Sequence, residues 1–352
     1  MVGRIRQAGY CGRPGLGRRW RRVGVVALAC AVLVGAVCLL GRGWSGESLE
    51  ARIAAVDARR AVPAEENAAT LYDRLLTIDV IAGDPADPGL TPAGLAGLLA
   101  AAKMESCHFP LSAGSQCYRH HRKYLVAMRA WSRALDNAAT KDVAEGRTDA
   151  AGEKLYCLIR MGHHARGQPL FIDFQLGVEI ERRAWVLLRD WVMQADAGGE
   201  HLRLAEAMPA QLENDWEHLS SPMLEVQPLI AASVLAEYSL LQRLKNWRRQ
   251  RRAGDAVEIV RDKYLRLLSL RRGVSVLAGL RRYHDANDRW PDRLDEIKVL
   301  VPAQALLDPY TGQPFVYAPA GEVFRLFARG PNGIDDSRSP ANRADDVPIW
   351  PP

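Results

Sequence analysis

The segment PLFIDFQLGVEIERRAWVLLRDWV, residues 169–192, decides the fold class of this chain. It opens with a proline, which is favourable at the first position of a helix because no intrahelical hydrogen bond is lost there. Apolar side chains then recur every three or four residues, at Ile172, Leu176, Ile180, Ala184, Leu187 and Trp191. This spacing places them on one face of an α-helix. The segment therefore predicts a long helix with one buried stripe.

Helical patterns continue on both sides, from about residue 49 to residue 286. Proline, glycine and capping signals divide them into expected helices at 57–83 (broken at Pro63), from Thr91 onward, and at 118–144, 149–162, 222–247 and 256–286. The turn at Gly146 is similar to a tetratricopeptide hairpin, but no repeat of roughly 34 residues follows it. The pattern predicts a mainly α, irregular helical domain over residues 49–254.

The pattern changes after Ala286, where short apolar runs replace the long helices. Two strand-like runs, 314–317 and 322–328, flank Pro319-Ala320-Gly321, and this arrangement predicts a β-hairpin. A loop rich in Gly, Asn and Asp follows. We expect residues 255–352 to form a small α+β module, with a short antiparallel sheet built on the preceding helix.

The N-terminal region predicts a membrane anchor. Residues 23–41 are 19 consecutive uncharged, mostly apolar residues, which as a helix span roughly 28 Å, close to the hydrocarbon thickness of a bilayer. The tail at 1–22 contains seven arginines and no acidic residue. By the positive-inside rule this tail stays in the cytoplasm and the bulk of the chain faces the periplasm. We expect a single-pass protein of the bacterial inner membrane.

A cleaved export signal is the alternative interpretation of the same region. Its apolar part would be unusually long, and no small-x-small cleavage site follows it. Both interpretations place residues 49–352 outside the cytoplasm. The net charge of +6 combines +7 from the tail with −1 from the remaining residues, so the exported part has no excess charge with which to bind nucleic acid. The expected partners are the inner membrane and another envelope protein.

Three of the six cysteines lie beyond the apolar segment. Cys107 and Cys117 bracket a loop that contains proline and glycine, and in an oxidising compartment this spacing predicts a disulfide. Such a bond would contribute about 2–3 kcal/mol to stability. Cys157 falls in an apolar helical pattern and is expected to be a buried free thiol.

The C-terminal module carries a resemblance to a known family. Its motifs, in order, are a helix ending near Tyr283, Trp290-Pro291, DPYTGQPFVY at 308–317, GPNG at 330–333 and a terminal Trp350. This order resembles the periplasmic head of type II secretion major pseudopilins and implies that fold for the module alone. A pseudopilin begins with glycine and a hydrophobic helix carrying an early glutamate, whereas here Glu47 follows the apolar segment. The resemblance therefore does not imply assembly into a pilus.

The helical part has a second resemblance. The segment PAEENAATLY, residues 63–72, is similar to an uncharacterised family of membrane-anchored bacterial proteins, and this implies no mechanism.

The terminal loop is the candidate metal site. It offers side-chain oxygens from Asn332, Asp335, Asp336, Asp345 and Asp346. Calcium takes about six to eight oxygen ligands from carboxylates and carbonyls in flexible loops, and the resemblance implies calcium in the corresponding loop of pseudopilin heads. The spacing is not that of an EF-hand, so a solvated acidic loop is the alternative.

The sequence carries no recognisable catalytic motif: the Gly-x-Ser-x-Gly, His-Glu-x-x-His and phosphate-loop patterns are absent. The histidine pairs 120–121 and 163–164 cannot each chelate one ion, because adjacent helical residues point about 100° apart. Asp173, Glu179 and Glu181 lie near arginines and are expected to form surface ion pairs.

We therefore expect an envelope protein that acts in binding or structure. A type II secretion or pilus-related component is one alternative, and an envelope hydrolase with an unrecognised site is the other. A convergent polar pocket with perturbed acids would favour the hydrolase, whereas a smooth helical groove would favour binding.

Overall fold

The computed structural model describes residues 47–84, 87–194, 199–207, 216–238, 253–336 and 345–351. The predicted tail at 1–22 and the predicted membrane helix at 23–41 lie outside the described residues. Ser48–Glu237 and Glu258–Pro352 belong to one compact unit, to which the following description applies.

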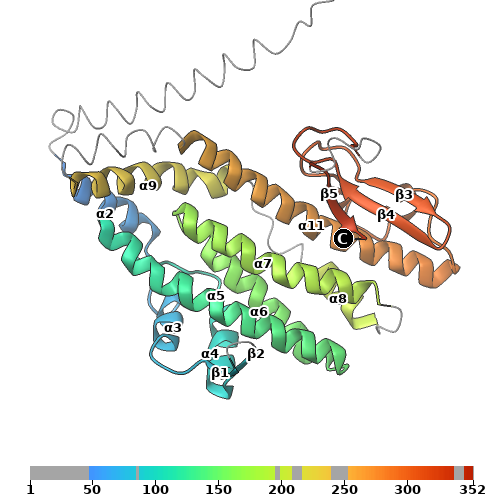
Figure 1. The fold of residues 1–352 in the computed structure, drawn as a ribbon, viewed down its shortest axis with the longest axis horizontal. Helices are drawn as coiled ribbons and strands as arrows, with labels where there is room; N and C mark the ends of the chain where they lie inside the picture. Colours follow the sequence, from blue (N-terminus) through green and yellow to red (C-terminus); the bar gives the residue numbers. More distant parts are fainter. Residues whose placement is uncertain are drawn as a thin grey trace, which may run out of the picture. The chain divides into compact units, whose positions relative to one another are not determined.

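The described part of the chain is mainly helical, as the sequence predicts. Its helices are α2 (Leu49–Arg60), α3 (Ala68–Leu75), α4 (Pro92–Ala102), α5 (Ser115–Ala144), α6 (Thr148–Arg166), α7 (Phe171–Val192), α8 (Gly199–Ala207), α9 (Trp216–Ala236) and α11 (Ala253–Asn287) (Figure 1). Thr91 caps α4 by accepting a hydrogen bond from the backbone N–H of Gly94, as its sequence predicts. Gly146 forms the predicted turn between α5 and α6 with a φ of 71°.

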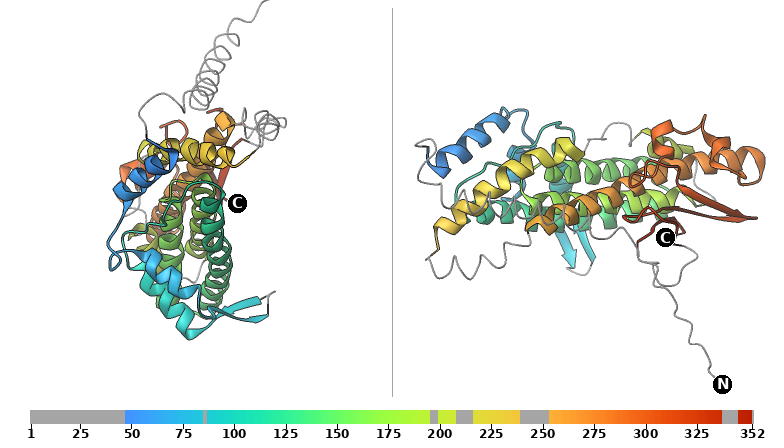
Figure 2. Two further views of the ribbon diagram at one scale, coloured as in Figure 1. Left: turned by 90° about the vertical axis from the view of Figure 1, so that its left-hand side faces the viewer. Right: turned by 90° about the horizontal axis from the view of Figure 1, so that it is seen from above.

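The helix predicted from residues 169–192 is α7. Leu176, Ile180, Ala184 and Trp191 are buried along one face, whereas Ile172 is 39% exposed. α7 packs beside α5 and α6 at the centre of the helical region (Figures 1 and 2). A Cβ at Gly177 would collide with the backbone nitrogen of Arg166 and the backbone oxygen of Gly162. Glycine is therefore required where α6 and α7 cross.

A β-hairpin interrupts the region that was expected to be wholly helical. Strands β1 (Ile81–Asp84) and β2 (Asp87–Leu90) pair antiparallel, so the helix predicted over 57–83 is wrong in its last part. The break at Pro63 is confirmed, since α2 ends before it and α3 begins after it. Gly83 has a φ of 93°, a conformation that ends helical structure and suits a turn.

The C-terminal region contains the predicted short antiparallel sheet. Two 3₁₀ helices, η2 (Leu294–Ile297) and η3 (Ala303–Leu306), precede strands β3 (Val316–Ala320), β4 (Val323–Ala328) and β5 (Val347–Trp350). The strand order is β3-β4-β5. The first two strands form the expected hairpin, and β5 was not predicted. Ile349 of β5 lies directly against α11, because a Cβ at Gly273 would collide with its side chain.

The predicted boundary at residues 254 and 255 does not separate two hydrophobic cores. Tyr264 of α11 packs against Phe174 of α7 and Trp216 of α9, with ring centroids 6.1 and 5.9 Å apart. Buried residues from α3 through β5 form one continuous cluster. The helical part and the C-terminal sheet therefore fold around a shared core.

Helix α9 is apolar enough to raise the question of whether it spans a membrane. Among the described residues it is the one helix that passes a test of length and composition for crossing a membrane, and 39% of its most apolar window is buried. Val226 and Ile230 share a hydrophobic cluster with Ile53 and Val56 of α2. Core helices pass the same test, so it is weak evidence for a span.

Candidate binding groove

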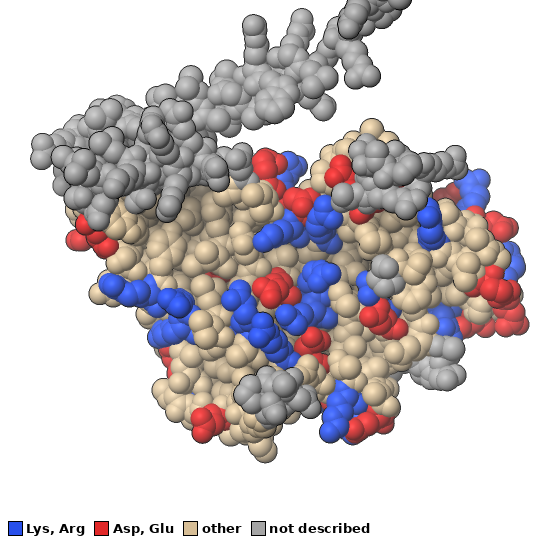
Figure 3. All heavy atoms as spheres, in the orientation of Figure 1, with Lys and Arg blue, Asp and Glu red and all other residues tan. Residues whose placement is uncertain are grey.

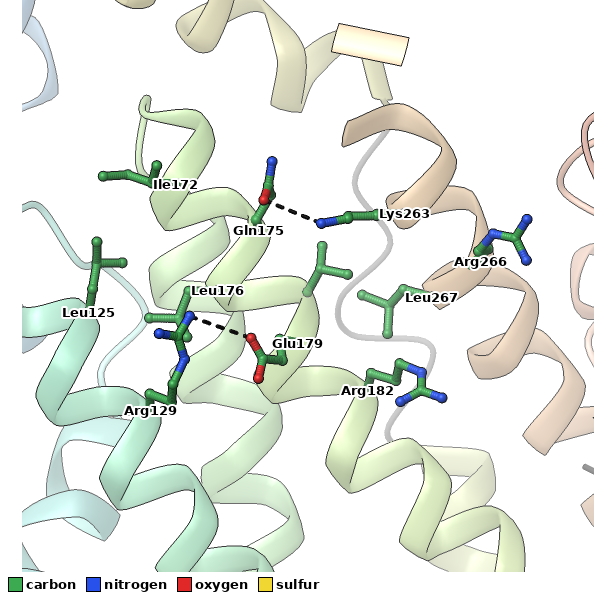
Figure 4. Close-up of a pocket in the computed structure, with 11 residues that line it drawn as sticks. Leu125, Arg129, Ile172, Gln175, Leu176, Glu179, Arg182, Lys263, Arg266 and Leu267 are labelled. Atoms are coloured by element: carbon green, nitrogen blue, oxygen red, sulfur yellow. Dashed lines mark hydrogen bonds and ion pairs between the residues drawn. The ribbon is translucent and has the colours of Figure 1, made fainter. Parts of the chain in front are cut away.

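An open groove with a volume of about 540 Å³ crosses α5, α7 and α11 (Figure 4). Its apolar lining comes from Leu125, Ile172, Leu176, Val178 and Leu267. Its polar lining comes from Arg129, Gln175, Glu179, Arg182, Lys263 and Arg266. The lining therefore holds four cationic side chains and one carboxylate.

Helical spacing explains how α7 contributes both kinds of lining. Ile172, Gln175, Glu179 and Arg182 follow one another at intervals of three or four residues, so they share the face that points away from the core. On the surface shown in Figure 3, Lys and Arg atoms gather near the centre of the face, with acidic atoms between them.

The one carboxylate in the groove is already paired. Arg129 Nη2 lies 3.6 Å from Glu179 Oε2, and Arg183 Nη2 lies 3.5 Å from Glu179 Oε1. Arg266 in turn pairs with Asp262 at 2.9 Å, just outside the groove. These pairs are partly exposed, so each contributes little to stability.

Two cationic side chains of the groove have no carboxylate partner in the described part of the chain. Lys263 Nζ donates only to the amide oxygen of Gln175, at 3.3 Å. Arg182 makes no ion pair with any described residue. One of these cations lies on α11 and the other on α7, with Leu267 between them in Figure 4.

A second set of polar residues lies in the interior and holds elements together. His121 Nδ1 donates to Asp173 Oδ2 at 2.6 Å, and both side chains are buried. His108 Nε2 lies 2.7 Å from Asp57 Oδ1 and joins α2 to the loop before α5. The surface pairing predicted for Asp173 is therefore wrong.

Glu181 is the second acid of α7 that was wrongly expected at the surface. Its Oε1 accepts from Arg166 Nε at 2.9 Å, and neither side chain is exposed. Arg166 Nη1 and Glu181 Oε2 are buried without a hydrogen-bond partner among the described residues. The pair is therefore incompletely satisfied.

The histidines at 163 and 164 do not form a metal site in this structure. Burial lowers the pKa of each to about 3, so both are neutral near pH 7. The Tyr72 hydroxyl donates to Nδ1 of His164 at 3.0 Å, and Nε2 of His164 donates to the Met104 carbonyl at 2.9 Å. Within the described ranges no group of three or more His, Cys, Asp or Glu side chains is placed to hold a metal ion.

The predicted disulfide is absent from the structure, where Cys107 and Cys117 are both free thiols. Cys107 packs against the main core, and its carbonyl accepts from Gln168 Nε2 at 2.9 Å. Cys117 lies in the first turn of α5 and faces the smaller cluster that contains Leu170 and Ile230. The two thiols therefore belong to different packing environments. Cys157 is buried and free, as predicted, and burial raises its pKa to about 12.

The terminal loop brings several of its predicted oxygen donors together. The Asn332 amide donates to Asp336 Oδ2 at 2.5 Å. Burial raises the pKa of Asp346, and the nearby carboxylates of Asp335 and Asp336 raise it further. One carboxylate oxygen of Asp346, Oδ1, is buried without a hydrogen-bond partner in the described structure. A cation could satisfy that oxygen, but the described carboxylates of this loop do not form a group placed to hold a metal ion, so calcium binding stays a prediction.

The sequence does not predict that the residues of the groove come together in space. The arginines of α7 were interpreted only as ion-pair partners, and Lys263 and Leu267 lie far along the chain on another helix. The helical period of α7 does predict an outward face, which is the one available signal.

Comparisons with known proteins found no match for this chain. No protein-family model matches the chain, and no curated protein and no solved structure matches it. The functional assignment therefore depends on the groove and on the predicted anchor.

Proposed function

We propose that this chain is a membrane-anchored binding protein of the bacterial envelope and that the groove over α5, α7 and α11 is its binding surface. The observation that supports this function is the pair Arg182 and Lys263, two cations without a carboxylate partner among the described residues. They border an apolar floor, and an anionic partner would complete their pairing.

The location of this protein follows from the sequence. Residues 23–41 would anchor it in the inner membrane, with the arginine-rich tail in the cytoplasm and residues 49–352 in the periplasm. A reporter fused after residue 60 is expected to be active only in a form that senses the periplasm. A reporter active in the cytoplasm at that position would contradict the proposed topology.

Binding is favoured over hydrolysis by the distribution of titratable groups. The histidines with strongly lowered pKa values are buried in the core, where His164 is already bonded on both ring nitrogens. The carboxylate that does face the groove, Glu179, is engaged by two arginines. A general acid or base must lie within hydrogen-bond reach of the group that it protonates or deprotonates, and the enclosed ring of His164 does not meet that condition.

The proposed function is tested by photo-crosslinking in intact cells. A photoreactive amino acid replaces Ile172, which lies in the groove wall and is 39% exposed. The matched control replaces Ile78, an exposed apolar residue outside the groove lining. A crosslinked product at position 172 that is missing at position 78 is expected. Identical patterns at the two positions would contradict the proposal.

A secretion-related role is a second candidate, and the C-terminal region favours it. There a long helix, α11, carries a three-stranded antiparallel sheet, an arrangement consistent with the resemblance to pseudopilin heads. A photoreactive residue at Val323, exposed on β4, would then capture a component of a secretion system. Capture at Val323 without capture at Ile172 would favour this candidate over the groove.

A further inference from the structure

The groove is asymmetric, because three of its four cationic residues lie on one side, which also holds Leu267. In Figure 4, Ile172 and Leu125 lie on one side, whereas Lys263, Arg266 and Arg182 lie on the other. Arg129 is on the apolar side, but it is engaged by Glu179 at 3.6 Å. The cations without a carboxylate partner in the described structure are therefore confined to the side formed by α11 and the later part of α7.

The dimensions of the groove suit one small ligand. Its volume of about 540 Å³ falls within the range of roughly 300–1,000 Å³ that is usual for small-molecule sites. The ten-residue separation of Ile172 and Arg182 along α7 corresponds to roughly 15 Å at 1.5 Å per residue. An extended alkyl chain can follow that length.

We infer that the groove binds a long-chain fatty acid, with the carboxylate on the side of Arg182 and Lys263 and the alkyl chain directed toward Ile172 and Leu125. This inference rests on the proposed function and specifies its ligand. An arginine fork and a lysine ammonium both donate strongly to a carboxylate. An amphipathic peptide is a poorer match, because its acidic side chains would be spread along the groove and would meet cations at one end only.

The inference is tested with the full chain in lipid nanodiscs and a palmitate that carries a diazirine on its alkyl chain. A fatty alcohol with the same chain and the same diazirine serves as the neutral probe. After illumination, mass spectrometry identifies the labelled residues. We expect the palmitate probe to label side chains around Ile172 and Leu125, and the alcohol to label them about tenfold less, because it lacks the charge-assisted bonds.

Two double variants separate the groove cations from charge in general. Arg182→Gln with Lys263→Gln is expected to reduce labelling by palmitate about tenfold. Arg74→Gln with Lys103→Gln removes two exposed cations outside the groove lining and should leave labelling unchanged. Unchanged helical circular dichroism and melting temperature in both variants would exclude loss of folding as the cause.

Equal labelling by acid and alcohol, or labelling that survives the Arg182 and Lys263 substitutions, would overturn the fatty-acid inference. If palmitate labels nothing while Ile172 still crosslinks to a protein in cells, the ligand is a peptide segment. That result would refute the fatty acid and leave the binding function intact, so the two failures are distinguishable.

Discussion

On the inward face of α7, Asp173 and Glu181 are 2% and 0% exposed, whereas Glu179 lies on the outward face in the groove. All three acids have a basic partner within hydrogen-bonding or ion-pairing distance. These acids differ in their solvation. A buried carboxylate has lost its hydrating water and depends on its basic partner for stabilisation, whereas an exposed carboxylate remains hydrated. The inward acids therefore hold the helices together, and the outward acid changes the net charge of the proposed binding groove.

The largest expected effect comes from breaking the inward pair. Glu181→Ala should destabilise the protein by about 3–5 kcal/mol, because it leaves the Arg166 guanidinium buried without its carboxylate. The free energy of unfolding from urea titration measures this loss. The double substitution Arg166→Leu with Glu181→Leu should recover most of it, since both unsatisfied atoms of the pair are then removed. A loss below about 1 kcal/mol for Glu181→Ala would contradict the structural role.

Asp346 of the terminal loop extends the comparison to a carboxylate with one buried oxygen, Oδ1, that has no hydrogen-bond partner in the described structure. If calcium supplies that partner, saturation at about 100-fold over the dissociation constant adds about 2.7 kcal/mol. The melting temperature of the whole protein should then be higher in calcium than in chelator. Asp346→Asn should abolish the difference and Glu179→Gln should preserve it. Superimposable melting curves of the unmutated protein in calcium and in chelator would contradict the predicted calcium binding.

Lowering the pH provides a third test of the difference between buried and exposed ionisable side chains. The pKa of His164 is about 3 in the folded protein because burial disfavours its charged form, whereas it is about 6.5 in the unfolded chain. Because the pKa of His164 is lower in the folded protein than in the unfolded chain, its contribution to the free energy of unfolding is constant well above pH 6.5. As the pH falls below about 6.5, protonation favours the unfolded chain and the free energy of unfolding decreases. Between about pH 6.5 and pH 5 this histidine should reduce the free energy of unfolding by about 2 kcal/mol.

The variant that isolates this effect is His164→Gln, which cannot be protonated. Its free energy of unfolding should vary less with pH over the same interval than that of the unmutated protein. The same substitution at the exposed His218, His218→Gln, provides the control. An equal pH dependence in all three proteins would show that His164 is not held neutral.

The smallest expected effect is at the outward acid. Glu179→Gln removes the carboxylate that pairs with Arg129 and Arg183, and Arg183 keeps its second pair, with Asp136; these partly exposed pairs contribute about 0.5 kcal/mol or less. Stability should therefore hardly change, whereas affinity for an anionic ligand should increase because the groove loses its one carboxylate. Titration with palmitate measures the second effect. A destabilisation as large as that of Glu181→Ala would show that the two faces of α7 do not differ.

The elements that the sequence predicts well depend on local patterns. The period of α7, the cap at Thr91 and the turn at Gly146 are each set by a few neighbouring residues, and all are found in the structure. The β1–β2 hairpin was missed because its strands are only four residues each and adjoin helical patterns. Short runs leave too few repeats to distinguish one period from another.

The features that the sequence predicts poorly depend on contacts between distant residues. Ten positions separate Cys107 from Cys117, but that spacing does not reveal that the two thiols face different clusters. Likewise, the sequence of α7 does not distinguish the buried Glu181 from the exposed Glu179, because arginines follow both. The groove requires Leu125, Ile172 and Lys263 to meet, and no local pattern places them together.

The shared core of α7, α9 and α11 also determines when the chain can finish folding during its synthesis. A ribosome releases the N-terminal helices first, and until α11 emerges Phe174 and Trp216 have no Tyr264 to cover them. Any nascent or truncated chain that stops before residue 253 therefore presents an uncovered aromatic surface to chaperones and proteases. Protein quality control can thus distinguish complete from incomplete copies by whether Phe174 and Trp216 are covered by Tyr264.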